Sequence, residues 1–162
     1  MGGGSVAALG AALSAALLEK LLCDARLARR FRRIRQDCLR LSRADAEAFA
    51  RVIRATRTGN RRAFARSLKA AIEIPCTVFT HARVLEAASR TARRTVSPRC
   101  RSDVSCAQAF AQASGEAARG FIETNLAWLH DPSYTRRLRR KLGWSLRRNG
   151  RRRDLHGTRS RC

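Results

Sequence analysis

The residues Ser102 to Leu129, SDVSCAQAFAQASGEAARGFIETNLAWL, decide the fold of this chain. Small and apolar side chains recur in this stretch at three- and four-residue intervals, which is the period of one face of an α-helix. Ser102 or Asp103 is placed to cap the start of this helix, and His130-Asp131-Pro132 ends it. The apolar face consists of Val104, Ala107, Ala111, Ser114, Ala118, Phe121, Ile122, Asn125, Leu126 and Leu129.

The rest of the chain also predicts helices, since it is rich in alanine and contains only three prolines. We expect Ser5 to cap the first helix, and Pro75 to kink the third helix or split it in two. Phe49 and Ile53 belong to the apolar stripe of the second helix. The sequence therefore predicts an all-α fold, a bundle of about five helices with a kinked central helix. The expected helices cover residues 6–22, 27–56, 61–94, 102–129 and 134–146.

A chain of 162 residues suits one compact domain, which we expect to cover residues 2–146. The remaining residues, 147–162, are rich in arginine and poor in apolar side chains, a composition that is typical of disorder. We therefore predict a disordered basic C-terminal tail after one helical domain.

The charge of the chain is strongly positive, with 35 lysines and arginines against 12 aspartates and glutamates and a net charge of +23. Such a charge is typical of proteins that bind nucleic acid, because neutralised phosphates release counterions. It also results from a compositional bias that places arginine on solvated helix faces. Since the arginines are scattered through every segment, the second interpretation is favoured, and contact with nucleic acid is predicted only through the tail.

The six cysteines form no Cys-x-x-Cys pair and are accompanied by no pair of histidines, so no metal site is predicted. Most of them fall in helical stretches, where cysteine packs as a small apolar residue. The apolar run from Val6 to Leu18 is too short to span a bilayer and follows no basic leader. We therefore expect a soluble cytoplasmic protein that does not enter a membrane.

The glycine run Gly2-Gly3-Gly4 precedes Ser5 and the first expected helix. Free backbone N–H groups and the helix dipole make such a start a physical site for an anion. Spacing alone, however, favours a flexible start with a serine cap. The signal of a binding site is therefore weak when this segment is taken by itself.

Asp45 and Asp103 are the candidate carboxylates for chemistry. Asp45 borders the apolar stripe of the second helix, where a carboxylate suits either proton transfer or an ion pair with an arginine. Asp103 equally fits the role of a helix cap. Asn125 lies on the packing face of its helix, where its amide either joins two helices or holds the ring of a ligand. The residues alone leave these alternatives open.

Several segments resemble, in the same order, the sequence blocks of the cyclodeaminase/cyclohydrolase family of folate one-carbon enzymes. The ordered set spans residues 2–142 and is more specific than any of its members. The chain departs from the family pattern at Phe121, which stands where the family has the first Asn of its late helix. The matching blocks are GGGSVAAL at residues 2–9, DAEAF at 45–49, AAIEIP at 70–75, Ser102-Asp103 and Asn125-Leu126.

The resemblance implies an all-α bundle, usually a homodimer, that acts on a tetrahydrofolate derivative as its substrate and holds no tightly bound cofactor. Family members release ammonia from 5-formimino-tetrahydrofolate or hydrolyse 5,10-methenyl-tetrahydrofolate to the 10-formyl form. Carried onto this chain, the resemblance implies acid or base chemistry at Asp45 and Asp103. It implies substrate binding at Gly2, Gly3, Gly4, Ser5, Ser102 and Asn125. Two other functions are compatible with the sequence: a catalytically inactive dimeric helical scaffold, and a basic helical protein that binds nucleic acid.

Overall fold

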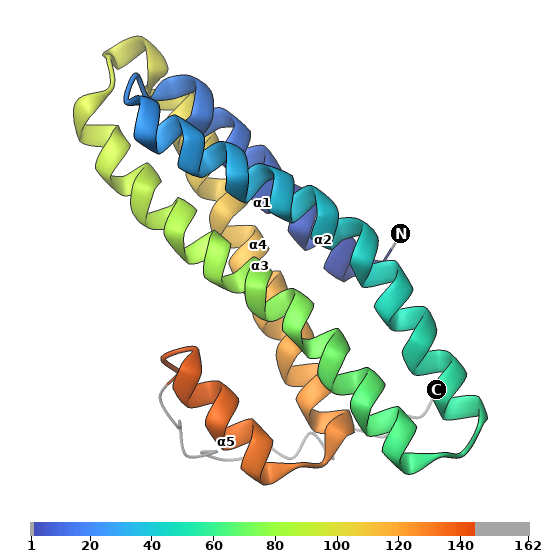
Figure 1. The fold of residues 1–162 in the computed structure, drawn as a ribbon. Helices are drawn as coiled ribbons and strands as arrows, with labels where there is room; N and C mark the ends of the chain where they lie inside the picture. Colours follow the sequence, from blue (N-terminus) through green and yellow to red (C-terminus); the bar gives the residue numbers. More distant parts are fainter. Residues whose placement is uncertain (1, 145–162) are drawn as a thin grey trace, which may run out of the picture. The chain divides into compact units, whose positions relative to one another are not determined.

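The computed structural model describes residues 2–144, and every regular element in that range is a helix (Figure 1). The predicted all-α fold is therefore confirmed. The chain divides into two compact units, Met1–Asp131 and Pro132–Cys162. The expected domain end at residue 146 and the tail at 147–162 lie outside the described residues. The helices are α1 (Gly3–Leu21), α2 (Ala25–Arg57), α3 (Arg61–Thr95), the 3₁₀ turn η1 (Pro98–Cys100), α4 (Arg101–Leu129) and α5 (Pro132–Lys141).

Successive helices of the first unit run antiparallel and are joined by short turns (Figure 1). Asp24 caps α2, because its Oδ1 accepts hydrogen bonds from the N–H groups of Arg26 and Leu27 at 2.7 and 2.9 Å. Asn60 caps α3 in the same way, with its Oδ1 accepting from Ala63 N–H at 3.0 Å. Between α2 and α3, Gly59 has a φ of 66°, a conformation that glycine adopts without strain. The tight turns thus follow from local sequence.

The first helix begins earlier than expected. α1 starts at Gly3 with Gly2 as its N-cap, and no side chain caps it. The predicted cap, Ser5, lies inside the helix and is 1% exposed. The expected Ser5 cap is therefore wrong, because this hydroxyl is turned into the bundle rather than toward the end of its own helix.

The start of α4 is also earlier than expected. Cys100 occupies the N-cap position, and the predicted caps Ser102 and Asp103 both lie within the first turns of the helix. The 3₁₀ turn η1 accounts for the difference, because it leads directly into the helix and fixes its start before Ser102 is reached. The predicted end is confirmed, since α4 stops at Leu129 and His130 adopts a left-handed φ of 50°.

Pro75 does not split α3, which continues from Arg61 to Thr95. A proline inside a helix removes one backbone N–H donor and crowds the preceding turn. Here the proline is buried, and its neighbours Ile72 and Cys76 are buried on the same helix. Packing against the bundle therefore holds the helix together across this position.

The last helix, α5, belongs to the second unit and is shorter than expected, ending at Lys141 rather than near residue 146. Gly143 has a φ of 68°, and its N–H donates to the Arg140 carbonyl at 3.1 Å. The Trp144 N–H donates to the Arg139 carbonyl at 2.9 Å. This pair of bonds is the glycine-based helix stop known as the Schellman motif, and the glycine explains the early end.

The core of the first unit forms where α1 packs against α2 and α4. Small side chains make the contact, and Ala8, Ala11 and Ala15 are completely buried. Gly10 shows how close α4 comes, since a Cβ built on it would lie 2.5 Å from Ser114 Oγ. The Ser14 hydroxyl donates to the Ala107 carbonyl at 2.7 Å across the same contact. These small residues let three helices approach closely.

By length and composition α1 could cross a membrane, and within residues 2–144 it is the one helix that could. The prediction that this segment is too short to span a bilayer was based on the apolar run Val6–Leu18, which is shorter than the full helix. The most apolar 18-residue segment of α1 has a mean hydropathy of 1.3, and 44% of that segment is buried inside the protein. Buried core helices of soluble proteins share these properties.

Replacing Ala11 by leucine should lower the free energy of unfolding by about 1–3 kcal/mol, because the added methyl groups have no space in the contact with α2 and α4. Ala113→Leu is the matched control, since Ala113 is an exposed position in the middle of α4. That change should leave stability within about 0.5 kcal/mol. Urea unfolding of both variants measures the difference, and equal stability would contradict the close packing of α1.

Candidate functional site

The start of α1 and the middle of α2 meet at Asp45. The Ser5 hydroxyl, which is buried, donates a hydrogen bond to Asp45 Oδ2 at 3.1 Å. Gly4 lies directly beneath the same carboxylate, because a Cβ built on Gly4 would come within 2.4 Å of Asp45 Oδ1. A Cβ on Gly2 would lie 3.7 Å from Oδ2. The structure therefore places Gly2, Gly4 and Ser5 beside Asp45, as the predicted site requires. Gly3 lies between them in the chain and faces Phe121.

Backbone geometry adds a positive field at this point. The first N–H groups of an α-helix have no acceptor within the helix, and the helix dipole makes this end positive. No side chain caps α1 at Gly2, so these donors are not satisfied by a local cap. A carboxylate or another anion is stabilised here, and Asp45 already occupies part of that position.

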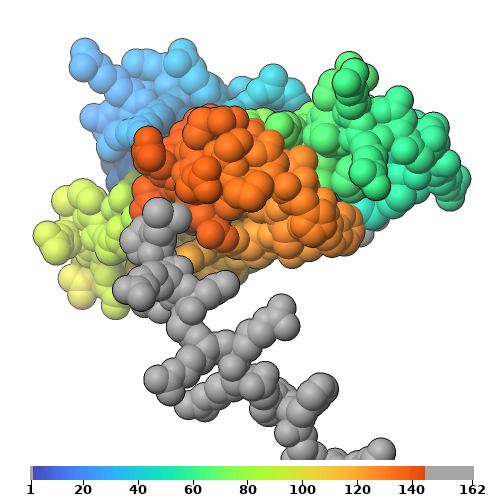
Figure 2. Space-filling view, turned by 90° about the horizontal axis from the view of Figure 1, so that it is seen from below, coloured from blue at the N-terminus to red at the C-terminus, as the bar shows by residue number. Residues whose placement is uncertain are grey.

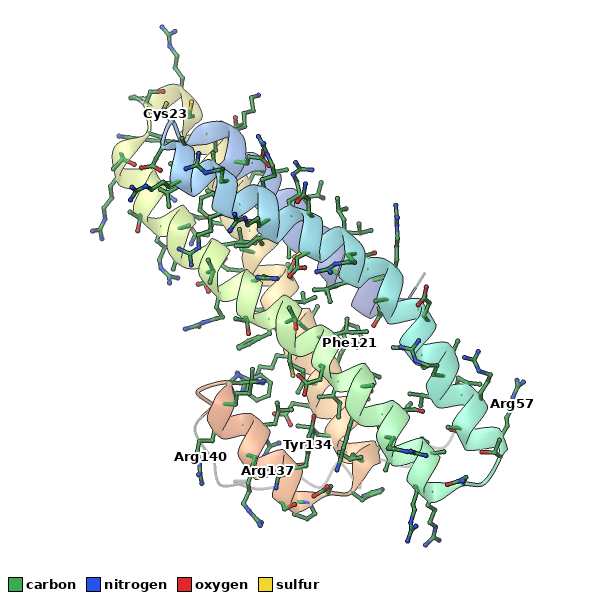
Figure 3. The ribbon with its side chains drawn as sticks, in the orientation of Figure 1. Cys23, Arg57, Phe121, Tyr134, Arg137 and Arg140 are labelled. Atoms are coloured by element: carbon green, nitrogen blue, oxygen red, sulfur yellow. The ribbon has the colours of Figure 1, made fainter. Side chains whose placement is uncertain are left out.

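Phe121 of α4 forms a second wall beside the glycine run. A Cβ built on Gly3 would lie 2.4 Å from Cζ of the Phe121 ring, so only a glycine fits against the ring as it stands. Figure 3 labels Phe121 in the middle of the first unit, where its ring points away from the axis of α4. The sequence did not predict Phe121 as a site residue and noted it as a departure from a family pattern. The helical spacing of apolar residues nevertheless placed it on the packing face of its helix.

Asn125 follows Phe121 by one turn of α4 and is half-buried. Residues four apart share one side of a helix, so Asn125 lies on the same side of α4 as Phe121, about 6 Å further along the axis. Because Gly3 lies against Phe121, Asn125 is one turn of α4 beyond the start of α1.

An uncovered apolar surface continues along α2 beyond Asp45. Phe49 and Ile53 follow Asp45 at four-residue intervals, and they are 56% and 37% exposed. The prediction that both belong to the buried stripe is wrong. The buried face of α2 instead passes through Ser42, Ala48 and Val52. α1 begins beside Asp45, so no part of α1 covers the more distant turns of α2.

Ser102 and Asp103 are not part of this site in a single chain. Both are exposed in the first turns of α4. Asp103 precedes Phe121 by eighteen residues of continuous helix, a separation of about 27 Å along the axis. One chain therefore does not place Asp45 and Asp103 on the same small ligand.

The cysteines occupy both core and surface. Cys38 and Cys76 are buried, whereas Cys23 and Cys106 are exposed. Burial raises the pKa of the Cys38 thiol to about 12, so this thiol stays protonated and packs as an apolar group. Among residues 2–144, no group of three or more His, Cys, Asp or Glu side chains is placed to hold a metal ion.

Comparison with known proteins identifies related sequences and folds. The model of the family described as formiminotransferase-cyclodeaminase matches residues 24–143, a range that contains Asp45, Phe121 and Asn125 but not the glycine run. The crystal structure of formiminotetrahydrofolate cyclodeaminase from Thermotoga maritima is similar with a TM-score of 0.81 and 20% sequence identity. The similarity covers 88% of this chain and 78% of that chain. No curated protein sequence gives a significant match.

A double-mutant cycle should detect the Ser5–Asp45 bond. Ser5→Ala and Asp45→Ala should each lower stability, and the double variant should lose less than their sum by about 0.5–1.5 kcal/mol, because one hydrogen bond is counted twice. Ser14→Ala is the matched control, since its buried hydroxyl bonds the Ala107 carbonyl instead. Combined with Asp45→Ala it should be additive. Additivity in both cycles, measured by urea unfolding, would refute the bond.

Proposed function

The chain belongs to the formiminotransferase-cyclodeaminase family, and we propose that it is a folate one-carbon enzyme that releases ammonia from 5-formimino-tetrahydrofolate. The observation that carries the proposal is the cluster of Gly4, Ser5 and Asp45 at the uncapped start of α1. Hydrolysis of 5,10-methenyl-tetrahydrofolate is the related reaction that the same groups would support.

Asp45 is the proposed acid or base. Loss of ammonia needs a proton on the leaving nitrogen, and closure of the folate ring releases one from the attacking nitrogen. The Ser5 hydroxyl holds Asp45 Oδ2 in place, which leaves Oδ1 beside the backbone of Gly4. A carboxylate fixed on one oxygen in this way has its second oxygen oriented for proton transfer.

The planar pterin of the substrate would lie against the apolar surface beside Asp45. Phe121 supplies an aromatic wall, Phe49 and Ile53 supply an exposed apolar floor, and Asn125 supplies an amide for the polar edge of a ring. The uncapped N–H groups of α1 would stabilise negative charge on the ligand. The net charge of +23 would attract an acidic folate over a longer range.

We further propose a homodimer in the cytoplasm, with no tightly bound cofactor. Val6 and Leu13 lie on one side of α1, two turns apart, and are 57% and 52% exposed. A second copy would cover such a stripe and bury it. A dimer also offers the one way in which the predicted Asp103 could act with Asp45, since the partner chain could supply it.

A catalytically inactive helical scaffold is the second candidate. It is favoured by Phe121, whose ring lies against Gly3 where the family resemblance implies an amide. An aromatic ring supports packing and apolar binding but moves no proton. Measured turnover decides between the two candidates.

Asp45→Asn should lower kcat for ammonia release from 5-formimino-tetrahydrofolate by about 10²- to 10⁴-fold, because the amide cannot exchange a proton with the substrate. Ser5→Ala should have a smaller effect, since it loosens the carboxylate without removing it. Formation of the methenyl product, followed by its absorbance, measures both. Full activity of Asp45→Asn would exclude the proposed role of Asp45.

Asp103→Asn tests the second predicted carboxylate in the same assay. Unchanged activity would show that Asp45 acts without Asp103. If Asp103→Asn is also inactive, mixing the two inactive variants should restore part of the activity, because mixed dimers would contain one intact site. Failure of that mixture to regain activity would exclude a site shared between two chains.

A further inference from the structure

A groove of about 790 Å³ lies between α2 and α3. Arginines from the first half of α2 form one wall, and His81 and Val84 of α3 form part of the other. Along α2, Arg33 precedes Asp45 by about 18 Å and Arg40 precedes it by about 7.5 Å. The groove is bounded by α2 and α3, whereas Asp45 bonds Ser5 of α1, so the two features involve different neighbouring helices. Its charged lining residues on α2 are Arg26, Arg29, Arg30, Arg33, Asp37 and Arg40.

The carboxylate in the groove is already neutralised. Asp37 forms an ion pair with Arg40, and its Oδ2 lies 2.9 Å from His81 Nε2. Burial lowers the pKa of His81, so at neutral pH the imidazole is uncharged and donates its Nε2 proton to Asp37. Asp37 alone would favour the protonated imidazole, but its charge is shared with Arg40 and desolvation prevails.

The remaining arginines of the groove have no acidic partner. No ion pair joins Arg26, Arg29, Arg30 or Arg33 to a carboxylate within the described part of the chain. By contrast, Arg32 and Arg35 on a neighbouring face of α2 both pair with Glu19 of α1, at 2.8 and 2.9 Å. Like charges one turn apart on a helix repel each other and destabilise it. An anionic ligand would relieve this repulsion.

We propose that the groove between α2 and α3 binds the sugar-phosphate backbone of single-stranded nucleic acid. The arginines from Arg26 to Arg33 extend over about 10 Å of helix, and those from Arg26 to Arg40 over about 21 Å. A single phosphate reaches only part of such a row, whereas successive phosphates of one strand neutralise it along its length.

The lining also determines what kind of recognition the groove supports. Guanidinium groups bind phosphate oxygens in pairs and carry no information about base sequence. Ile34 and Val84 provide an apolar surface, and among the described residues no Phe, Tyr or Trp lines the groove to stack on bases. Binding should therefore be independent of sequence and steeply dependent on salt.

Fluorescence anisotropy with a labelled mixed-sequence 15-nucleotide DNA strand and the full chain tests the proposal. Arg29→Gln/Arg33→Gln should weaken binding about tenfold or more at 0.1 M salt and reduce the slope of log K against log salt by about 1.4. Arg61→Gln/Arg62→Gln is the matched control, with the same loss of charge. Both arginines are exposed and begin α3. The first turns of α3 belong to the green region of Figure 2. The control should bind as the unaltered chain does.

Equal weakening in both double variants, or no binding by the unaltered chain, would overturn the proposal, because total charge or the arginine-rich tail would then account for any affinity. A polyglutamate peptide of equal charge is the competing ligand. If it binds as tightly as the strand and is weakened equally by the groove variant, the groove recognises carboxylates, and the nucleic-acid assignment is wrong. Thermal unfolding of each variant should match the unaltered chain, since glutamine preserves the helix.

Discussion

The structure of the first unit depends on the close approach of α1 to α2 and α4. Alanines and Gly10 make this contact, and the distance between the helices leaves little space for a larger side chain. Burial of a continuous alanine face contributes little area per residue, but three helices gain contacts at once. The Ser14 bond to the Ala107 carbonyl fixes the position of α1 along α4. Everything at the candidate site follows from that position.

The candidate site exists because α1 starts where it does. If α1 began at Val6, as its composition suggested, the Ser5 hydroxyl would cap the helix and would not reach Asp45. Instead Gly3 and Gly4 enter the helix, and their missing side chains leave space for Phe121 and the Asp45 carboxylate. The same glycines lower the intrinsic helix propensity of the first turn of α1. Their contact with α2 and α4 offsets that cost.

Positive charge is distributed unevenly once the chain is folded. Arg32 and Arg35 lower the pKa of Glu19 by donating hydrogen bonds to it, and this pairing ties the end of α1 to α2. Arg29 and Arg33, on the same helix, line a groove whose carboxylate, Asp37, is already paired with Arg40 and His81. Composition alone does not distinguish Arg29 and Arg33 from Arg32 and Arg35. A compositional bias toward arginine accounts for all four. Their partners distinguish them.

The sequence by itself determined the helical class, the turns and most of the packing face of α4. These features are local, since helical period, Asp24 and Asn60 caps and Gly59 act within a few residues of chain. It also singled out Asp45, the glycine run and Asn125, through an ordered resemblance. Only the tertiary structure decided that Phe49 and Ile53 are exposed, that Ser5 bonds Asp45, and that the glycine run meets α4 at Phe121 rather than near Asp103. Each of these depends on where one helix ends beside another, and no periodicity within a single helix contains that information.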